Sequence, residues 1–93
     1  MLSLTRPSGS KVFVGDKPDR TVVTVKSVNH ETRIVEFEVS CPGYPKQITR
    51  LTPRNTYSIG PGTYMKLLDI TNEHSAKVGF SGPREVRIER DDR

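Results

Sequence analysis

The residue types that most often carry out catalysis are few and scattered in this chain. It has one cysteine, Cys41, between Ser40 and Pro42, and two histidines, His30 and His74. Both histidines fall in segments with the composition of hairpin turns, which favours solvated side chains over a pair of metal ligands. Cys41 has no positioned base that would activate a thiolate, so we expect a small half-buried residue. The sequence predicts no catalytic residues, no metal site and no cofactor, and we do not expect an enzyme.

Arginine is the residue type whose placement carries more information. Arg6 ends the first apolar stretch, and Arg84, Arg87 and Arg90 recur at every third position near the C-terminus. A guanidinium group is a planar fork that binds phosphate or the edge of guanine. Exposed strand backbone adds N–H and C=O groups that can read the unstacked bases of single-stranded RNA. The alternative, which charge alone favours, is a solvated strand face of alternating Arg and Glu.

Composition excludes several classes of protein. Fifteen Lys and Arg against eleven Asp and Glu give a net charge of +4, which permits nucleic-acid binding without demanding it. No run of 18 apolar residues exists, and the first residues lack the layout of a signal peptide. A single cysteine forms no internal disulfide, so we expect a cytoplasmic protein.

The elements that must position these arginines are strands. Val, Ile and Thr are abundant and Ala is nearly absent, a bias typical of pleated, half-buried surfaces. Alternation and turn residues predict a first strand that ends at Arg6 and further strands over residues 11–14, 21–28, 33–39, 56–59, 64–70, 76–80 and 84–90. No stretch has a helical period, so the sequence predicts an all-β fold within a single domain, residues 1–93.

The two halves of the chain resemble each other, which indicates an internal duplication with pseudo-repeats at residues 1–46 and 47–93. The alternative is that any two series of short antiparallel strands look alike. The matching segments are residues 4–6 with 48–50, 11–15 with 56–60, 24–28 with 66–70, and 37–42 with 78–83.

The two ends of the chain carry a recognisable pair of motifs. The opening reads MLSLTR, followed by Gly9 and the run VFVGD. The closing run, AKVGFSGPREVRIER, contains Pro-Arg-Glu-Val, with Arg90 six residues after Arg84. Together these motifs resemble the CsrA/RsmA family of bacterial translational regulators, and they cover about a third of the chain.

The resemblance implies a fold, a ligand and a site. Family members are small five-stranded chains that interlock as symmetric dimers, with the first strand of one subunit beside the last strand of the other. Each such pair of strands binds a GGA trinucleotide in the hairpin loop of an mRNA leader or a small regulatory RNA. The RNA-binding residues implied for this chain are Leu4, Thr5, Arg6, Gly82, Pro83, Arg84, Val86, Arg87, Ile88 and Arg90.

The chain also departs from the family. It is half again as long, it lacks the family's C-terminal helix, and Pro7 stands where a second basic residue is common. We therefore expect a small interlocked, barrel-like β-sheet domain in the form of a single-chain pseudo-dimer, in which residues 46–52 close the first unit and open the second. The two terminal strands would pair within one chain and form one site. The second site, near Tyr44 and Arg50, would be lost or altered.

The sequence thus predicts an RNA-binding regulator of translation that is monomeric and does not engage membranes. A homodimer with a large insertion is the structural alternative. The functional alternative is an interaction protein that antagonises, or mixes with, CsrA-type regulators without strong RNA binding of its own.

Overall fold

The computed structural model describes residues 2–15, 20–60, 62–82 and 87–90. These residues form nine β-strands and no helix, so the prediction of an all-β fold is confirmed, and none of them could cross a membrane as a helix. The strands are β1 (Leu2–Pro7), β2 (Lys11–Val14), β3 (Thr21–Asn29), β4 (Ile34–Ser40), β5 (Gln47–Leu51), β6 (Thr56–Gly60), β7 (Thr63–Asn72), β8 (Ser75–Ser81) and β9 (Ile88–Arg90).

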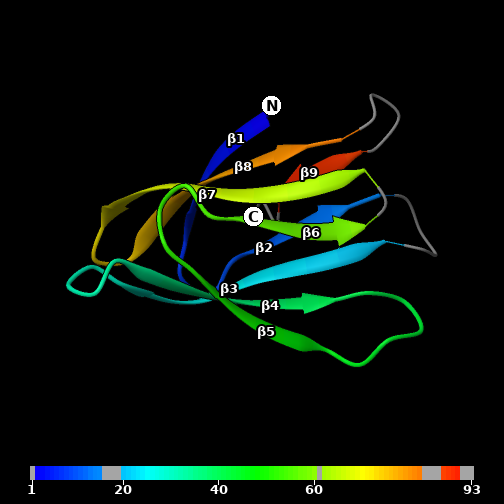
Figure 1. Cartoon of the computed structure of the whole chain (residues 1–93), viewed down its shortest axis with the longest axis horizontal. Coiled ribbons are helices and arrows are strands. Elements are labelled where there is room, and N and C mark those ends of the chain that lie inside the picture. Colours follow the sequence, from blue (N-terminus) through cyan, green and yellow to red (C-terminus); the bar gives the residue numbers. More distant parts are fainter. Residues whose placement is uncertain (1, 16–19, 61, 83–86, 91–93) are drawn as a thin grey trace.

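The strands build two antiparallel sheets that share one core (Figure 1). The four-stranded sheet has the order β1-β8-β7-β6, and the five-stranded sheet has the order β5-β4-β3-β2-β9. Side chains alternate between the two faces of a strand, and each sheet turns its apolar face inward. Phe37 of β4 and Phe80, Met65 and Leu67 of the other sheet are almost completely buried there.

The two terminal strands do not pair with each other. β1 pairs with β8, where Leu2 lies opposite Phe80, and β9 pairs with β2, where Val12 lies opposite Arg90. The expected hydrogen-bonded pairing of the first strand with the last is therefore wrong. The reason is the short connection after β1: Ser8 N–H donates to the carbonyl of His74 in one sheet, and the next residue already bonds to the other sheet. Each terminal strand is consequently the edge of a different sheet.

The turns before β2 and β6 carry the chain between the sheets in the same way. Gly9 N–H donates to the Val25 carbonyl at 2.7 Å, and Arg54 N–H donates to the Leu67 carbonyl at 2.6 Å. The second bond joins positions 45 and 42 residues after those of the first. Both donors have left-handed backbone, with φ of 89° at Gly9 and 76° at Arg54. In both halves, the chain thus passes from one sheet to the other with the same backbone geometry.

The inner strands repeat an irregularity as well. The pairing of β3 with β4 shifts register between Val25 and Ser27, and the pairing of β7 with β8 shifts between Leu67 and Asp69, which are 42 residues further along. A β-bulge of this kind bends a strand and increases its twist. The division into residues 1–46 and 47–93 remains a prediction, with the repeated crossing and the repeated bulge in its favour.

The structure corrects one detail of the duplication. The first five residues of β1 and the five residues of β5 share one burial pattern, and this places Arg6 with Leu51, both buried, and Thr5 with Arg50, both exposed. The alignment of Arg6 with Arg50 is therefore wrong by one residue. A shift by one residue moves every side chain of a strand to the other face, so this difference decides which arginine meets the solvent.

The repeated crossing yields a stability prediction. Arg54→Gly should raise the free energy of unfolding by about 0.5–1 kcal/mol, because glycine removes the left-handed strain at a modest cost in chain entropy. Gly9→Ala should lower it by about 1 kcal/mol, because the added methyl meets no atom within 4 Å and only the backbone conformation is penalised. Urea unfolding measures both. Arg54→Ala is the control and should be nearly neutral; a gain as large as that of Arg54→Gly would contradict the role of φ.

Candidate functional site

Residues 4–6 of β1, which form one side of the implied RNA site (the β1 wall), expose mainly their backbone. Of its three residues, Thr5 is exposed, Leu4 is half-buried against the core, and Arg6 is only 8% exposed. β1 lies at the edge of its sheet, so alternate N–H and C=O groups along it point away from β8. The sequence prediction that the Arg6 side chain supplies charge to RNA is not favoured by this burial.

The β9 wall combines free backbone with an exposed cation. Gly15 N–H donates to the Arg87 carbonyl at 2.7 Å, which turns the backbone of Arg87 toward β2. Because bonding directions alternate along an antiparallel strand, the N–H and C=O of Ile88 point to the free edge. The Ile88 side chain packs against the core, whereas Arg87 is 65% exposed and forms an ion pair with Glu89 at 3.3 Å.

Four of the predicted residues are described only in part or not at all. Pro83, Arg84 and Val86 lie outside the described residues, and for Arg90 only the backbone, in β9, is described. Gly82 follows β8 and is exposed. A Cβ atom added there would lie 3.1 Å from the hydroxyl oxygen of Thr63, so the Thr63 side chain would have to shift by a few tenths of an ångström to admit a methyl group.

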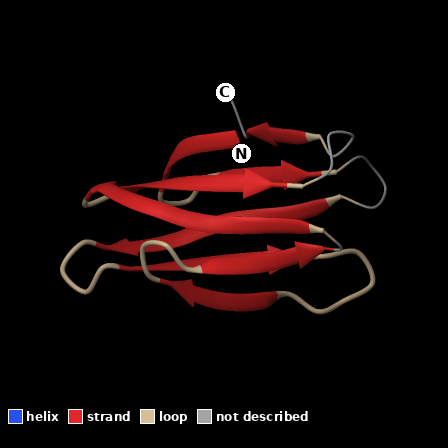
Figure 2. Ribbon diagram, turned by 45° about the horizontal axis from the view of Figure 1, so that its top comes forward, coloured by secondary structure: helices blue, strands red, loops and turns tan. Residues whose placement is uncertain are grey.

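Topology brings both walls to one side of the molecule. The chain passes from β1 to β2 within residues 8–10, and β2 is the neighbour of β9. In Figure 2 both β1 and β9 lie at the top of the molecule, close to the labels of the two chain ends. Residues 2–7 of the opening motif and residues 88–90 of the closing motif thus sit on edges of two different sheets, whereas residues 76–81 of the closing motif lie in β8, between β1 and β7.

The outer face of β4 and β5, in the five-stranded sheet, carries two ion pairs. Glu36 of β4 pairs with Arg50 of β5 at 3.0 Å, and Glu38 pairs with Lys46 at 4.0 Å. Such exposed pairs contribute little to stability, but they cancel charge locally. The outer face of β4 and β5 therefore offers little net attraction for an anion.

The outer face of the four-stranded sheet has the opposite character. The positions 41 residues after Glu36 and Glu38 are Lys77 and Gly79. Lys77 lies beside Thr5 of β1, and Lys66 of β7 lies beside Gly79. The face that adjoins β1 therefore has a lysine and a glycine where its counterpart has two glutamates, and Lys66 adds a second positive charge.

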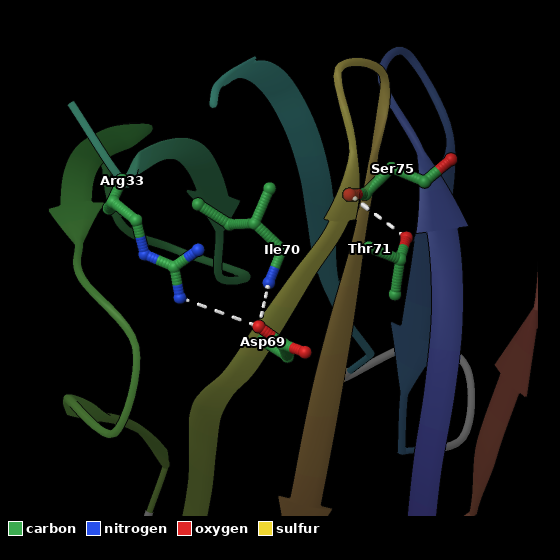
Figure 3. A network of polar contacts seen from close by, with 5 residues as sticks. All are labelled: Arg33, Asp69, Ile70, Thr71 and Ser75. Atoms are coloured by element: carbon green, nitrogen blue, oxygen red, sulfur yellow. Dashed lines mark hydrogen bonds and ion pairs between the residues drawn. The ribbon is translucent and has the colours of Figure 1, made fainter. Parts of the chain in front are cut away.

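One acid on this face is bound by an arginine from the other half of the chain. Asp69 of β7 accepts from the Arg33 guanidinium at 3.5 Å and from the N–H of Ile70 at 2.8 Å (Figure 3). Thr71 fastens the adjoining hairpin by donating to the carbonyl of Ser75 at 3.2 Å. Arg33 belongs to the turn between β3 and β4, so the pair links the two sheets and offsets the charge of Asp69.

The remaining reactive residue types do not assemble. His30 lies in the turn between β3 and β4 and His74 in the turn between β7 and β8, both exposed, so their placement in turns is confirmed. Cys41 is half-buried and accepts a long hydrogen bond, 3.7 Å, from the Thr21 hydroxyl. Within the part of the chain that the structure describes, no three His, Cys, Asp or Glu side chains cluster as metal ligands.

Sequence reasoning missed a groove beside β6. It has a volume of about 430 Å³, and it lies between residues 57–60 of β6 and the segment that joins β4 to β5. The available signal was the pair Pro42 and Pro45, because proline cannot donate to a β-ladder and so keeps that segment out of the sheet.

No family model, curated protein or solved structure matches this chain. The resemblance of its two ends to the CsrA/RsmA family therefore remains a prediction from the residues themselves.

The close approach at Gly82 gives a test of its structural role. Gly82→Ala should lower the free energy of unfolding by about 1–2 kcal/mol, because the new methyl presses on the buried Thr63. In the double variant with Thr63→Ala the cost of the added methyl should fall by at least about 0.5 kcal/mol, since contacting residues couple. A double-mutant cycle in urea measures this coupling, and strictly additive effects would contradict the contact.

Proposed function

We propose that this protein is an RNA-binding post-transcriptional regulator that recognises GGA motifs in the loops of mRNA leaders or small RNAs. One observation carries the proposal: β1 and β9, which hold the first residues of the opening motif and the last residues of the closing motif, form edges of two different sheets on one side of the molecule. An unstacked RNA segment lying across these edges would contact residues 4–6 and 87–90 together.

Backbone groups supply the recognition in this proposal. Along β1 and at Ile88, N–H and C=O groups point out of the sheets, and unpaired groups of this kind match the donors and acceptors of a guanine edge. Sequence preference would then come from the main chain and from the shape of the edge. This account does not need the buried Arg6 to reach the RNA.

Positive charge supplies the affinity. Arg87 beside β9 and Lys77 beside β1 are both exposed, and Lys66 lies on the same outer face as Lys77. Contacts with phosphate release counterions, so binding should weaken steeply as salt rises. By the family resemblance, RNA bound over a ribosome-binding site would block translation, and small RNAs with many GGA loops would compete for the protein.

The opposite side of the molecule lacks the second half of such a site. β5 occupies the position that corresponds to β1, and its outward Arg50 is ion-paired with Glu36. In the described residues, β6 has no outer neighbour that would correspond to β9. We therefore propose one RNA site per chain, where a family dimer has two.

Two arginines with nearly equal surroundings test the location of the site. Arg87 and Arg50 are 65% and 67% exposed, and each is ion-paired with a glutamate. Arg87→Ala should weaken binding of a GGA-loop hairpin by about 1–3 kcal/mol, whereas Arg50→Ala should leave it unchanged. Fluorescence anisotropy at one stated salt concentration measures both. Equal losses would refute the location, and a wild-type protein that does not bind the hairpin would support the interaction alternative.

The number of sites is tested separately. Isothermal titration of the chain with a hairpin that carries one GGA loop should give one RNA per chain. The same hairpin with the GGA replaced is the control for non-specific binding. Two equal sites per chain would contradict the single-site model.

A further inference from the structure

Within the described residues, β6 has a neighbouring strand on one side only, at a place where its counterpart β2 has two neighbours. β2 lies between β3 and β9, whereas β6 pairs with β7 and ends the four-stranded sheet. The Gly15 N–H bonds to β9 through Arg87, so Gly15 and Phe13, two residues earlier, turn their backbone toward β9. The positions 45 residues later are Gly60 and Ser58. Leu67 N–H donates to the Asn55 carbonyl, so bonding alternates along β6 and the N–H and C=O of Ser58 face away from β7, whereas Gly60 lies beyond a β-bulge and pairs with Thr63.

The chain's own nearest segment is unsuited to fill this side. Residues 41–45 follow β4 and contribute Cys41, Pro42, Tyr44 and Pro45 to the groove, but the two prolines have no N–H for a ladder. Just beyond this segment, at the start of β5, the side-chain amide oxygen of Gln47 accepts a hydrogen bond from the Tyr57 hydroxyl of β6 at 3.2 Å. β5, the next strand, is already bonded to β4.

The groove beside the free edge is apolar. Its walls include Val39, Pro42, Pro45 and Ile59, and none of its lining residues is charged. Tyr44, at its rim, is 74% exposed. An exposed strand edge beside a pocket for side chains is the arrangement that binds extended peptides by strand addition, with affinity from the main chain and specificity from the pocket.

We propose that β6 and this groove bind an extended peptide segment of another protein as a fifth, antiparallel strand of the four-stranded sheet. The residue pattern of β9 indicates which side chains that segment should carry. Ile88 turns inward and packs on the core, while its neighbours Arg87 and Glu89 lie on the outer face. On the four-stranded sheet Lys66 of β7 lies on the outer face opposite Thr56 of β6, so an acidic residue fits an outward position of the added strand. The bound segment therefore alternates apolar and acidic residues.

A synthetic peptide with the sequence of residues 85–92 (EVRIERDD) is the direct probe, because it carries the β9 sequence and a net negative charge. In NMR titration of the full chain, the amide signal of Ser58 should shift, and its hydrogen exchange should slow at least about tenfold at saturation. Shifts centred on Gly15 would show exchange with β9 itself and would overturn the proposal. So would absence of binding at millimolar peptide.

Backbone methylation of the peptide tests the bonding pattern without altering the protein. Methylation of the Glu89 nitrogen should weaken binding at least about tenfold, because that N–H would face β6, whereas methylation of the Ile88 nitrogen should leave affinity nearly unchanged. Equal effects at both positions would refute a strand in this register.

Protein variants complete the test. Ser58→Pro removes a donor on the free side of an edge strand, where proline is tolerated, and should abolish peptide binding. Ser58→Ala keeps that donor and should bind normally, so loss in both variants would contradict the backbone role. RNA affinity should be unchanged in both, which separates this proposal from the proposed function. If light scattering shows a dimer that Ser58→Pro dissociates, the occupant is a second copy and the proposal is wrong.

Discussion

The crossing of the chain from one sheet to the other is the constraint on which this structure depends. At Gly9, and again at Arg54, one left-handed residue donates a backbone hydrogen bond to an inner strand of the facing sheet. This bond places β1 and β2, and likewise β5 and β6, in different sheets. Consecutive strands that would otherwise form a simple hairpin are thereby divided between two layers. The free edges of both sheets, and with them the proposed RNA site and the groove beside β6, follow from that division.

Much of the local structure could be predicted from the sequence, because alternation and turn composition act over short distances. The strands around Val35, Phe37 and Val39 and the turns at His30 and His74 are examples. The partners of the terminal strands could not be predicted in this way. A strand pairs equally well with any strand of suitable length, and its partner here is decided by the crossing at Gly9. The resemblance of the two ends pointed to neighbouring edges, and the structure has edges in separate sheets.

The alignment of β1 with β5 was the second feature that could not be predicted correctly from the sequence. The sequence aligns Arg6 with Arg50 because the residue types agree, whereas the fold aligns Arg6 with Leu51 because both point inward. Because side chains alternate between the two faces of a strand, the face to which a residue points aligns two strands more reliably than a shared residue type does. The same limit applies to the candidate site: the sequence indicated which segments carry arginines, but the side chains that reach solvent depend on the pleat. The groove beside β6 lies where the described residues place no second strand next to β6, and no sequence motif marks a missing strand.

The pairing of residues far apart along the chain has a consequence for how the molecule forms. Leu2 lies opposite Phe80 and Val12 lies opposite Arg90, so both pairings close loops of more than seventy residues, while β3 and β4 meet through a short hairpin. Loop closure of that length is entropically costly, and folds dominated by it form slowly. During synthesis the hairpins of the first half can assemble early, but the layers close only once the last strands have left the ribosome. Until then β1 and the outer side of β2 remain open to other strands, and this is the interval in which the nascent protein is most exposed to aggregation.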